Sequence, residues 1–203
     1  MLTSPGHLLV QARHAITGSV SWGTRPPCDQ PGVYVVSLHT DPNEGHGLSE
    51  APVSKAAVAA WIDRVESLTL DRGRPTTVAL MQRLARYWLP DEAIVYIGKA
   101  TSLRRRLGQY YATPLGDRRP HAGGHWIKTL TNLTSLTVHY AELDNVADAG
   151  AMEKAILLMF SQAVSSQTRA AHPQQALTIP FANLEIRGVG RRNHGIRHAV
   201  VRE

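Results

Sequence analysis

The stretch Val95-Tyr96-Ile97-Gly98-Lys99-Ala100 decides the expected fold of this 203-residue chain. Its β-branched and aromatic residues are typical of a strand. Thr101 or Ser102 comes next and can cap a following helix, because a hydroxyl side chain accepts a hydrogen bond from the first helical turn. We expect Gly98 and Lys99 to turn the chain from strand to helix, since glycine tolerates a tight bend. Beside exposed backbone N–H groups, this lysine is either a phosphate contact or a solvated side chain.

Two more strands and several helices are expected around this stretch. Further runs typical of strands are residues 32–38 and 136–140. Helices are expected at about 54–68, 78–88, 103–111, 125–130 and 146–164. Three short strands interleaved with helices indicate an α+β domain. The residues from about 165 to 203 show no such pattern and are expected to be irregular.

The composition favours a single domain with a polyanionic partner. With 43% hydrophobic residues, residues 1–203 can bury one core. The formal net charge is +6, and basic residues cluster at 104–106, 118–119 and 187–198. Such clusters favour a nucleic acid as partner, although solubility alone explains a mild positive charge equally well.

Cysteine usage and apolar runs bear on the expected location. Cys28 is the only cysteine, which excludes an internal disulfide and a cysteine-based zinc cluster and suits a reducing compartment. The first residues lack the features of a secretory signal, and no apolar run reaches the roughly 18 residues of a membrane span. We therefore expect a cytoplasmic protein that does not associate with a membrane.

Helical spacing separates the three consecutive arginines. Arg106 shares one helical face with Leu103, Leu107 and Tyr110, whereas Arg104 and Arg105 point elsewhere. Arg106 is therefore expected to face inward. It either points toward a functional site or packs its aliphatic part along the edge of the core and extends its guanidinium to solvent.

A carboxylate lies on the apolar stripe of the long helix expected at about 146–164. Glu153 lies in line with Leu157, Phe160 and Val164. Because an unpaired buried carboxylate is costly, Glu153 should meet a cation, a metal or hydrogen-bond donors. The alternative is that it lies in the first turn, where an acid complements the helix dipole.

Tyrosine and histidine pairs are the other candidates. If their strands pair antiparallel, Tyr34 and Tyr96 can stand on one face as cross-strand neighbours, although buried strand tyrosines are usually packing residues. Histidines with the i, i+4 spacing of a metal-binding helix occur at 121 and 125 and at 194 and 198. Neighbouring glycines make helices there improbable, so no metal site is expected at either pair.

Taken in order, these residues resemble the GIY-YIG nuclease superfamily. Gly32-Val33-Tyr34 looks like its first motif and Tyr96-Ile97-Gly98 like its second; Arg106, Glu153 and the asparagine region at 180–183 follow. The closest local likeness is to the N-terminal incision domain of the bacterial excision-repair nuclease, and the overall layout is similar to small stand-alone bacterial members. The likeness covers roughly residues 30–165.

The resemblance implies a small three-stranded antiparallel sheet flanked by helices. Tyr34 and Tyr96 stand much further apart in the sequence than the two motifs usually do. We therefore expect a two-helix insert at about 39–92 between the first two strands, and a basic C-terminal tail at about 184–203. The insert is a candidate protein-docking element.

The resemblance also implies roles for individual residues. Glu153 would hold a single catalytic Mg²⁺ (or Mn²⁺), and Arg106 and Lys99 would contact the scissile phosphate. Tyr34 would be the general base, with Tyr96 ordering the water, provided that nearby cations lower the tyrosine pKa. The expected catalytic set is completed by Tyr110 and by Asn183, which would brace the site. Candidate contacts to nucleic acid are Lys99, Arg104, Arg105, Lys128, Arg191 and Arg192.

The activity implied by this resemblance is a divalent-metal-dependent DNA endonuclease, restriction-like or repair-like. The alternative is a non-catalytic nucleic-acid-binding module that retains the fold. A nuclease kept silent by a partner protein is neither supported nor excluded by the residues. The complete set of Tyr34, Tyr96, Arg106 and Glu153 favours the enzyme, because a binding module has no physical need for a buried carboxylate facing a phosphate.

Overall fold

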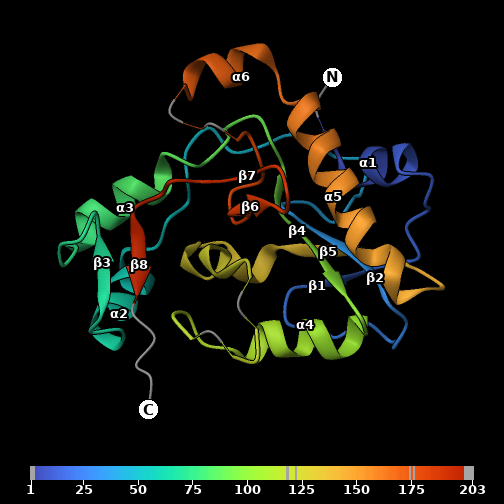
Figure 1. Ribbon diagram of the computed structural model, residues 1–203, viewed down its shortest axis with the longest axis horizontal. Coiled ribbons are helices and arrows are strands. Elements are labelled where there is room, and N and C mark those ends of the chain that lie inside the picture. The colour runs from blue at the N-terminus through green and yellow to red at the C-terminus, as the bar shows by residue number, and fades with distance from the viewer. Residues whose placement is uncertain (1–2, 118, 122, 174, 176, 199–203) are drawn as a thin grey trace.

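The fold is α+β and is built on one antiparallel sheet of four strands (Figure 1). The computed structural model describes residues 3–117, 119–121, 123–173, 175 and 177–198. The sheet has the spatial order β1-β5-β2-β4, and all three neighbouring pairs are antiparallel. Its strands are β1 (Gly18–Ser21), β2 (Gly32–Ser37), β4 (Ile94–Ala100) and β5 (Thr137–Glu142).

The expected three-stranded sheet with an insert between its first two strands is wrong. β1 precedes β2 in the chain and pairs with β5, so the insert falls between β2 and β4. Four residues, GSVS, are too few to show a convincing period of two. Gly18 is required for the pairing, because a Cβ atom there would lie 2.2 Å from the Tyr140 hydroxyl oxygen. This strand therefore exists through its partner rather than through its own pattern.

Helices begin where side chains can cap them. Ser4, Ser54, Thr76, Ser102, Asn145 and Ser165 each accept a hydrogen bond from a backbone N–H in the first turn. The helices that follow these caps are α1 (Pro5–Gln11), α2 (Lys55–Arg64), α3 (Thr77–Ala85), α4 (Leu103–Ala112), α5 (Val146–Ala163) and α6 (Ser166–Ala171). Two 3₁₀ helices, η1 (His125–Thr129) and η2 (Leu133–Ser135), precede β5. The sequence predicts α2, α3, α4 and α5 but not α1 or α6.

The sheet separates two hydrophobic clusters. Because side chains alternate along a strand, Val33, Val35 and Ile97 join the cluster that packs against α5 and α1. Tyr34 and Tyr96 join the opposite cluster, which contains side chains of α4, η1 and the insert. β2 is consequently buried on both faces.

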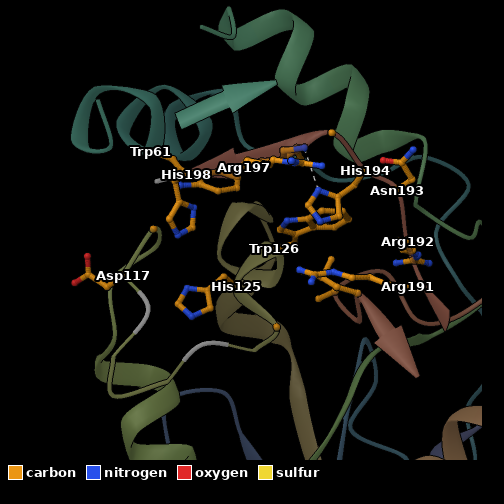
Figure 2. A pocket seen from close by; sticks show the side chains of 16 residues that line it. Trp61, Asp117, His125, Trp126, Arg191, Arg192, Asn193, His194, Arg197 and His198 are labelled. Atoms are coloured by element: carbon orange, nitrogen blue, oxygen red, sulfur yellow. Dashed lines mark hydrogen bonds between the residues drawn. The ribbon is translucent and has the colours of Figure 1, made fainter. Parts of the chain in front are cut away.

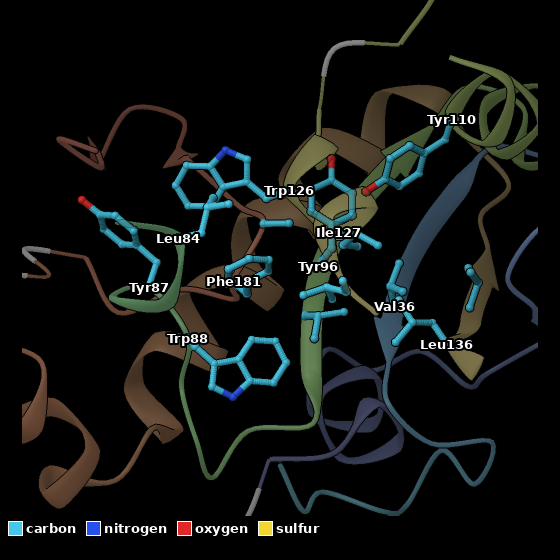
Figure 3. Packing of buried hydrophobic residues seen from close by; sticks show 14 of the residues in the cluster. Val36, Leu84, Tyr87, Trp88, Tyr96, Tyr110, Trp126, Ile127, Leu136 and Phe181 are labelled. Carbon is cyan, nitrogen blue, oxygen red and sulfur yellow. The ribbon is translucent and has the colours of Figure 1, made fainter. Parts of the chain in front are cut away.

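The insert is joined to the rest of the molecule by aromatic packing. Trp88, which follows α3, contacts Phe181 with ring centroids 5.4 Å apart. Phe181 in turn lies 5.7 Å from Trp126 of η1 (Figure 3). Such ring pairs add about 0.5 to 1.5 kcal/mol each beyond the burial of their area. The insert is therefore part of the core and not a loose appendage.

The C-terminal segment folds back on the insert, which corrects the expectation that it is irregular. It contains β6 (Glu185–Ile186), β7 (Gly190–Arg191) and β8 (Ile196–His198). Within the insert, β3 (Leu68–Leu70) pairs antiparallel with β8, so segments that are far apart in sequence form a two-stranded sheet. Residues 199–203 of the expected basic tail lie outside the described residues.

Candidate functional site

Tyr34 and Tyr96 form the centre of the candidate site. Their strands pair antiparallel with Tyr34 opposite Gly98 and Tyr96 opposite Val36, so the two tyrosines are diagonal neighbours on one face. Their ring centroids are 6.0 Å apart with an interplanar angle of 52°. The Tyr34 hydroxyl is buried and makes no hydrogen bond of acceptable geometry among the described residues, although the Tyr96 hydroxyl is near enough to influence its pKa.

Gly98 is needed by these rings and not by a turn. A Cβ atom at Gly98 would lie 2.6 Å from Cζ of Tyr34 and 2.8 Å from Cε1 of Tyr96. The expected turn at Gly98 and Lys99 is wrong, because β4 continues to Ala100 and the helix begins after its cap, Ser102. A side chain at position 98 would push the tyrosines away from the strand.

Arg106 is the inward arginine of the three, as the helical spacing predicts. It is half-buried, whereas Arg104 and Arg105 are exposed. Among the described residues, the Arg106 guanidinium makes no hydrogen bond or ion pair, yet its charge opposes the rise that burial causes in the pKa of both Tyr34 and Tyr96. By contrast, Arg104 donates to the Pro27 carbonyl at 2.5 Å, and Arg105 donates to the Thr101 hydroxyl at 3.0 Å. Arg106 thus brings an unpaired charge to the tyrosines.

Glu153 reaches the same place from α5. Its carboxylate is half-buried and lies 3.2 Å from Nζ of Lys99, at the end of β4. Burial raises the pKa of Glu153, while Lys99, Arg187 and Arg106 act in the opposite direction. Glu153 lies well beyond the first turn of α5, which begins at Val146, so complementing the helix dipole does not explain it.

Tyr110 and a glycine loop complete the wall of the site. The Tyr110 hydroxyl donates to the Gly124 carbonyl at 2.5 Å, and its ring stacks on His121 with centroids 4.1 Å apart. A Cβ atom at Gly123 would lie 2.6 Å from the Tyr96 hydroxyl oxygen, and one at Gly124 only 2.2 Å from that of Tyr110. The loop can pass these hydroxyls because it carries glycine twice. In the sequence, the two consecutive glycines between His121 and His125 are the signal for this close passage.

Asn183 lies behind the site and not in it. Its side-chain oxygen accepts from the Ile97 N–H at 2.9 Å, and its side-chain nitrogen donates to the Ile97 carbonyl at 2.8 Å. The neighbouring Ala182 N–H donates to the Val95 carbonyl. Asn183 therefore pairs with the backbone N–H and carbonyl groups of Ile97 at the outer edge of β4, as a neighbouring strand would. In this way it holds the strand that carries Tyr96 and Lys99.

Two of the expected nucleic-acid contacts are engaged inside the protein. Nζ of Lys128 donates to the carbonyls of Tyr110 (2.6 Å), Tyr111 (3.3 Å) and Thr113 at the end of α4. Arg192 is 4% exposed and donates to four backbone carbonyls. Arg191, in contrast, is exposed. The consecutive residues Arg191 and Arg192 thus point in opposite directions, one to solvent and one to the interior. The sequence alone did not reveal this distinction.

The tyrosines are held protonated. Burial raises the pKa of Tyr34 well above its ordinary value, and it raises the pKa of Tyr96 to about 12. Arg106 opposes both shifts, but desolvation outweighs it because the phenolate would be buried. The lowering of the tyrosine pKa that a general base requires is therefore not present in the free protein.

Acidic and histidine side chains near the site do not form a cluster of several metal ligands among the described residues. In the part of the chain that the structure describes, no group of three or more His, Cys, Asp and Glu side chains could hold a metal. His121 and His125 direct one ring nitrogen each to a backbone carbonyl. The charge of the Glu153 carboxylate acts on both tyrosines.

Comparisons with family models, with curated proteins and with solved structures give no match for this chain. No helix among the described residues is long and apolar enough to cross a bilayer. The function of the site has to be argued from its geometry.

Proposed function

We propose that the protein is a GIY-YIG-type nuclease that cleaves DNA with a divalent metal ion. The observation that carries the proposal is the meeting of Arg106, Lys99 and Glu153 around the Tyr34–Tyr96 pair. Each of these side chains comes from a different position in the chain, on β2, β4, α4 or α5. A purely structural core has no use for an unpaired guanidinium and a half-buried carboxylate beside buried hydroxyls.

The donor set fits Mg²⁺ or Mn²⁺ at a single site. Hard divalent cations keep several waters and accept one or two carboxylates together with substrate oxygens. Glu153 supplies one such carboxylate, and phosphate oxygens of the substrate would supply further donors. When bound there, the cation would stabilise negative charge on the leaving oxygen as a Lewis acid.

Arg106 is the residue best suited to the scissile phosphate. Its guanidinium is without a hydrogen-bond partner among the described residues and can donate two parallel hydrogen bonds to phosphate oxygens. Lys99 lies 3.2 Å from Glu153 and would add a second positive charge to the same phosphate. Together they favour the additional negative charge of the transition state.

We assign the Tyr96 hydroxyl to orienting the attacking water and the phosphate, and the buried Tyr34 hydroxyl to positioning Tyr96. Their raised pKa keeps them protonated near neutral pH, so each can donate one hydrogen bond and accept another. Asn183 and Gly98 keep Tyr96 and Tyr34 in register by holding β4 and by leaving room for the rings. This assignment replaces the expected role of Tyr34 as a general base in the free protein.

Plasmid cleavage tests the proposal. With Mg²⁺ the purified protein should nick or linearise supercoiled DNA, and Glu153→Gln or Arg106→Ala should each slow cleavage by about a hundredfold or more. Asp148→Asn is the matched control for the glutamate, since Asp148 is exposed on the same helix. Arg105→Ala is the control for the arginine and should cause only a modest, salt-sensitive loss.

Two results would decide against the enzyme. Cleavage that persists unchanged in both variants would place the activity elsewhere. Salt-dependent DNA binding with no cleavage under Mg²⁺ or Mn²⁺ would favour a non-catalytic binding module. If cleavage is found, end mapping on duplex, flap, branched and lesion-bearing DNA will separate a restriction-like from a repair-like role.

A further inference from the structure

A large cavity opens between the insert and the C-terminal segment (Figure 2). Its volume is about 840 Å³, within the range of small-molecule sites. The walls come from Trp61 of α2, from residues 116–117 and 124–126, from Ala182 and Leu184, and from residues 191–198. The cavity exists because β3 and β8 pair and hold the C-terminal segment against the insert.

The cavity carries an excess of positive charge. Arg191 and Arg197 are exposed on its wall, and neither lies within ion-pair distance of an acidic side chain among the described residues. Asp117 is the only acidic residue among the described lining residues, and it is already paired with Arg64 at 2.6 Å. An anionic ligand is favoured there.

Flat rings form part of the lining. The lining includes the buried rings of Trp61 and Trp126 and the half-buried imidazoles of His125 and His194. His194 lies 5.2 Å from Trp126, ring centroid to ring centroid. Burial, helped by four neighbouring arginines, lowers the pKa of His194 to about 4, and burial also lowers that of His125. Both imidazoles are neutral near pH 7 and can stack on a base or hydrogen-bond to its edge.

The cavity borders the candidate catalytic site. Gly124 belongs to the cavity lining, and a Cβ atom there would lie 2.2 Å from the Tyr110 hydroxyl oxygen and 3.0 Å from Cε2 of Tyr96. One backbone position therefore separates the two spaces.

We infer that the cavity receives one unpaired nucleotide of the DNA strand to be cut. Its base would lie against His125 and His194, and its phosphate would meet Arg191 and Arg197. This inference rests on the proposed nuclease function and deepens it, because it names an unstacked nucleotide as the feature of the substrate that the protein selects. Unpaired bases cost little to extrude, which makes such a pocket selective for bulged or single-stranded positions.

Binding without cleavage tests the cavity. The full chain carrying Glu153→Gln is titrated with two duplexes labelled with 2-aminopurine, one with the label in a single-nucleotide bulge and one fully paired. The bulged DNA should bind about tenfold more tightly, with the label changing its fluorescence as it enters the aromatic lining. Adding Arg191→Ala and Arg197→Ala together should remove most of that preference. Thermal unfolding of each variant checks that the fold is kept.

Arg13→Asn on the same background is a control for the loss of a positive charge away from the cavity, to be compared with Arg191→Ala and Arg197→Ala taken singly as well as together. It removes one positive charge at a position with φ 61°, a conformation that asparagine adopts readily. Arg13 follows α1, far from β8 in Figure 1. The control should leave the preference for the bulge intact.

The two proposals fail in different ways. Equal affinity for bulged and paired DNA would overturn the cavity assignment, whether or not plasmid is cut. So would an equal loss of affinity for the two DNAs when Arg191→Ala and Arg197→Ala are combined. Preference for the bulge that depends on Arg191 and Arg197, without cleavage by the wild-type chain, would keep the cavity and reject the nuclease.

Discussion

Arg192 and Arg106 are both withdrawn from solvent, and their surroundings are opposite. Arg192 is 4% exposed and donates five hydrogen bonds, four to backbone carbonyls and one to the Gln175 side chain. Its guanidinium also lies over the Tyr87 ring, 5.1 Å from the centroid. Arg106 is half-buried, and its guanidinium has no hydrogen bond or ion pair among the described residues.

The difference separates a structural cation from an available one. Arg192 holds the turn at 179–183 together and so positions Asn183 against β4. Arg106 contributes nothing comparable to the fold, and its charge is directed at the two tyrosines. Both terminal nitrogens of Arg192 are engaged by protein acceptors, and only its buried Nε has no partner among the described residues, whereas the whole Arg106 guanidinium keeps its donors for a substrate.

Truncating Arg192 should produce the largest loss of stability. Arg192→Ala removes a buried donor from the carbonyls of Ile179, Phe181 and Asn183 and from that of Pro180, which keeps the Asn183 N–H, so the free energy of unfolding should fall by about 3 to 5 kcal/mol. Arg106→Ala should change it by less than about 1 kcal/mol. Urea denaturation followed by tryptophan fluorescence measures both, with Arg191→Ala as the exposed neighbour control. Similar losses for Arg192→Ala and Arg106→Ala would break the comparison.

Adding a methyl group at Gly98 should cause an intermediate loss. In Gly98→Ala the new Cβ atom would lie 2.6 Å from Cζ of Tyr34. Relieving that overlap should cost about 1 to 3 kcal/mol and should reduce cleavage by displacing the tyrosines. Gly73→Ala is the control, because its nearest neighbour would be the Leu70 carbonyl at 3.9 Å. A Gly98→Ala protein with unchanged stability and activity would show that the close fit is unimportant.

Neutralising Glu153 should have the smallest effect, and it should be stabilising. Burial raises the pKa of Glu153 in the folded state above the 4.5 of an unperturbed glutamate. The carboxylate therefore destabilises the fold at pH values above its folded pKa, and this penalty disappears as the pH falls below the unfolded value. Glu153→Gln should raise the free energy of unfolding by about 0.5 to 1 kcal/mol at pH 7.

The pH dependence supplies the check on Glu153. The increase in the free energy of unfolding of Glu153→Gln over wild type should shrink as the pH falls through the pKa of Glu153 in the folded protein. It should vanish below about 4.5, the pKa of this group in the unfolded chain. Asp148→Asn, which changes an exposed acid on the same helix, should show no comparable gain. Destabilisation by Glu153→Gln at pH 7 would mean that the Lys99–Glu153 ion pair supports the fold more than burial opposes it.

Several residues of the candidate site were predictable because local periodicity places them. Helical spacing separated Arg106 from Arg104 and Arg105, and it put Glu153 on the apolar stripe of α5. The period of two in strands put Tyr34 and Tyr96 on one face once their strands pair antiparallel. These relations hold within one helix or one strand pair.

Other residues could not be assigned from the sequence, because their partners are distant in the chain. Lys128 and Arg192 looked like surface cations, but they bind carbonyls that only the folded chain brings together. The reason for Gly98 was misjudged as well, since the rings that exclude a side chain belong partly to another strand.

The sequence by itself determined the α+β class, the four longer helices, three of the four strands of the sheet, and the inward orientation of Arg106 and Glu153. Caps, periodicity and side-chain type act over a few residues, and that range is enough for these features. Only the tertiary structure decided that β1 joins the sheet and that β3 pairs with β8, where Thr69 and Arg197 are 128 residues apart. Such short strands have too few residues to show a pattern and are stable only when paired. The cavity that we assign to a nucleotide is a product of that pairing.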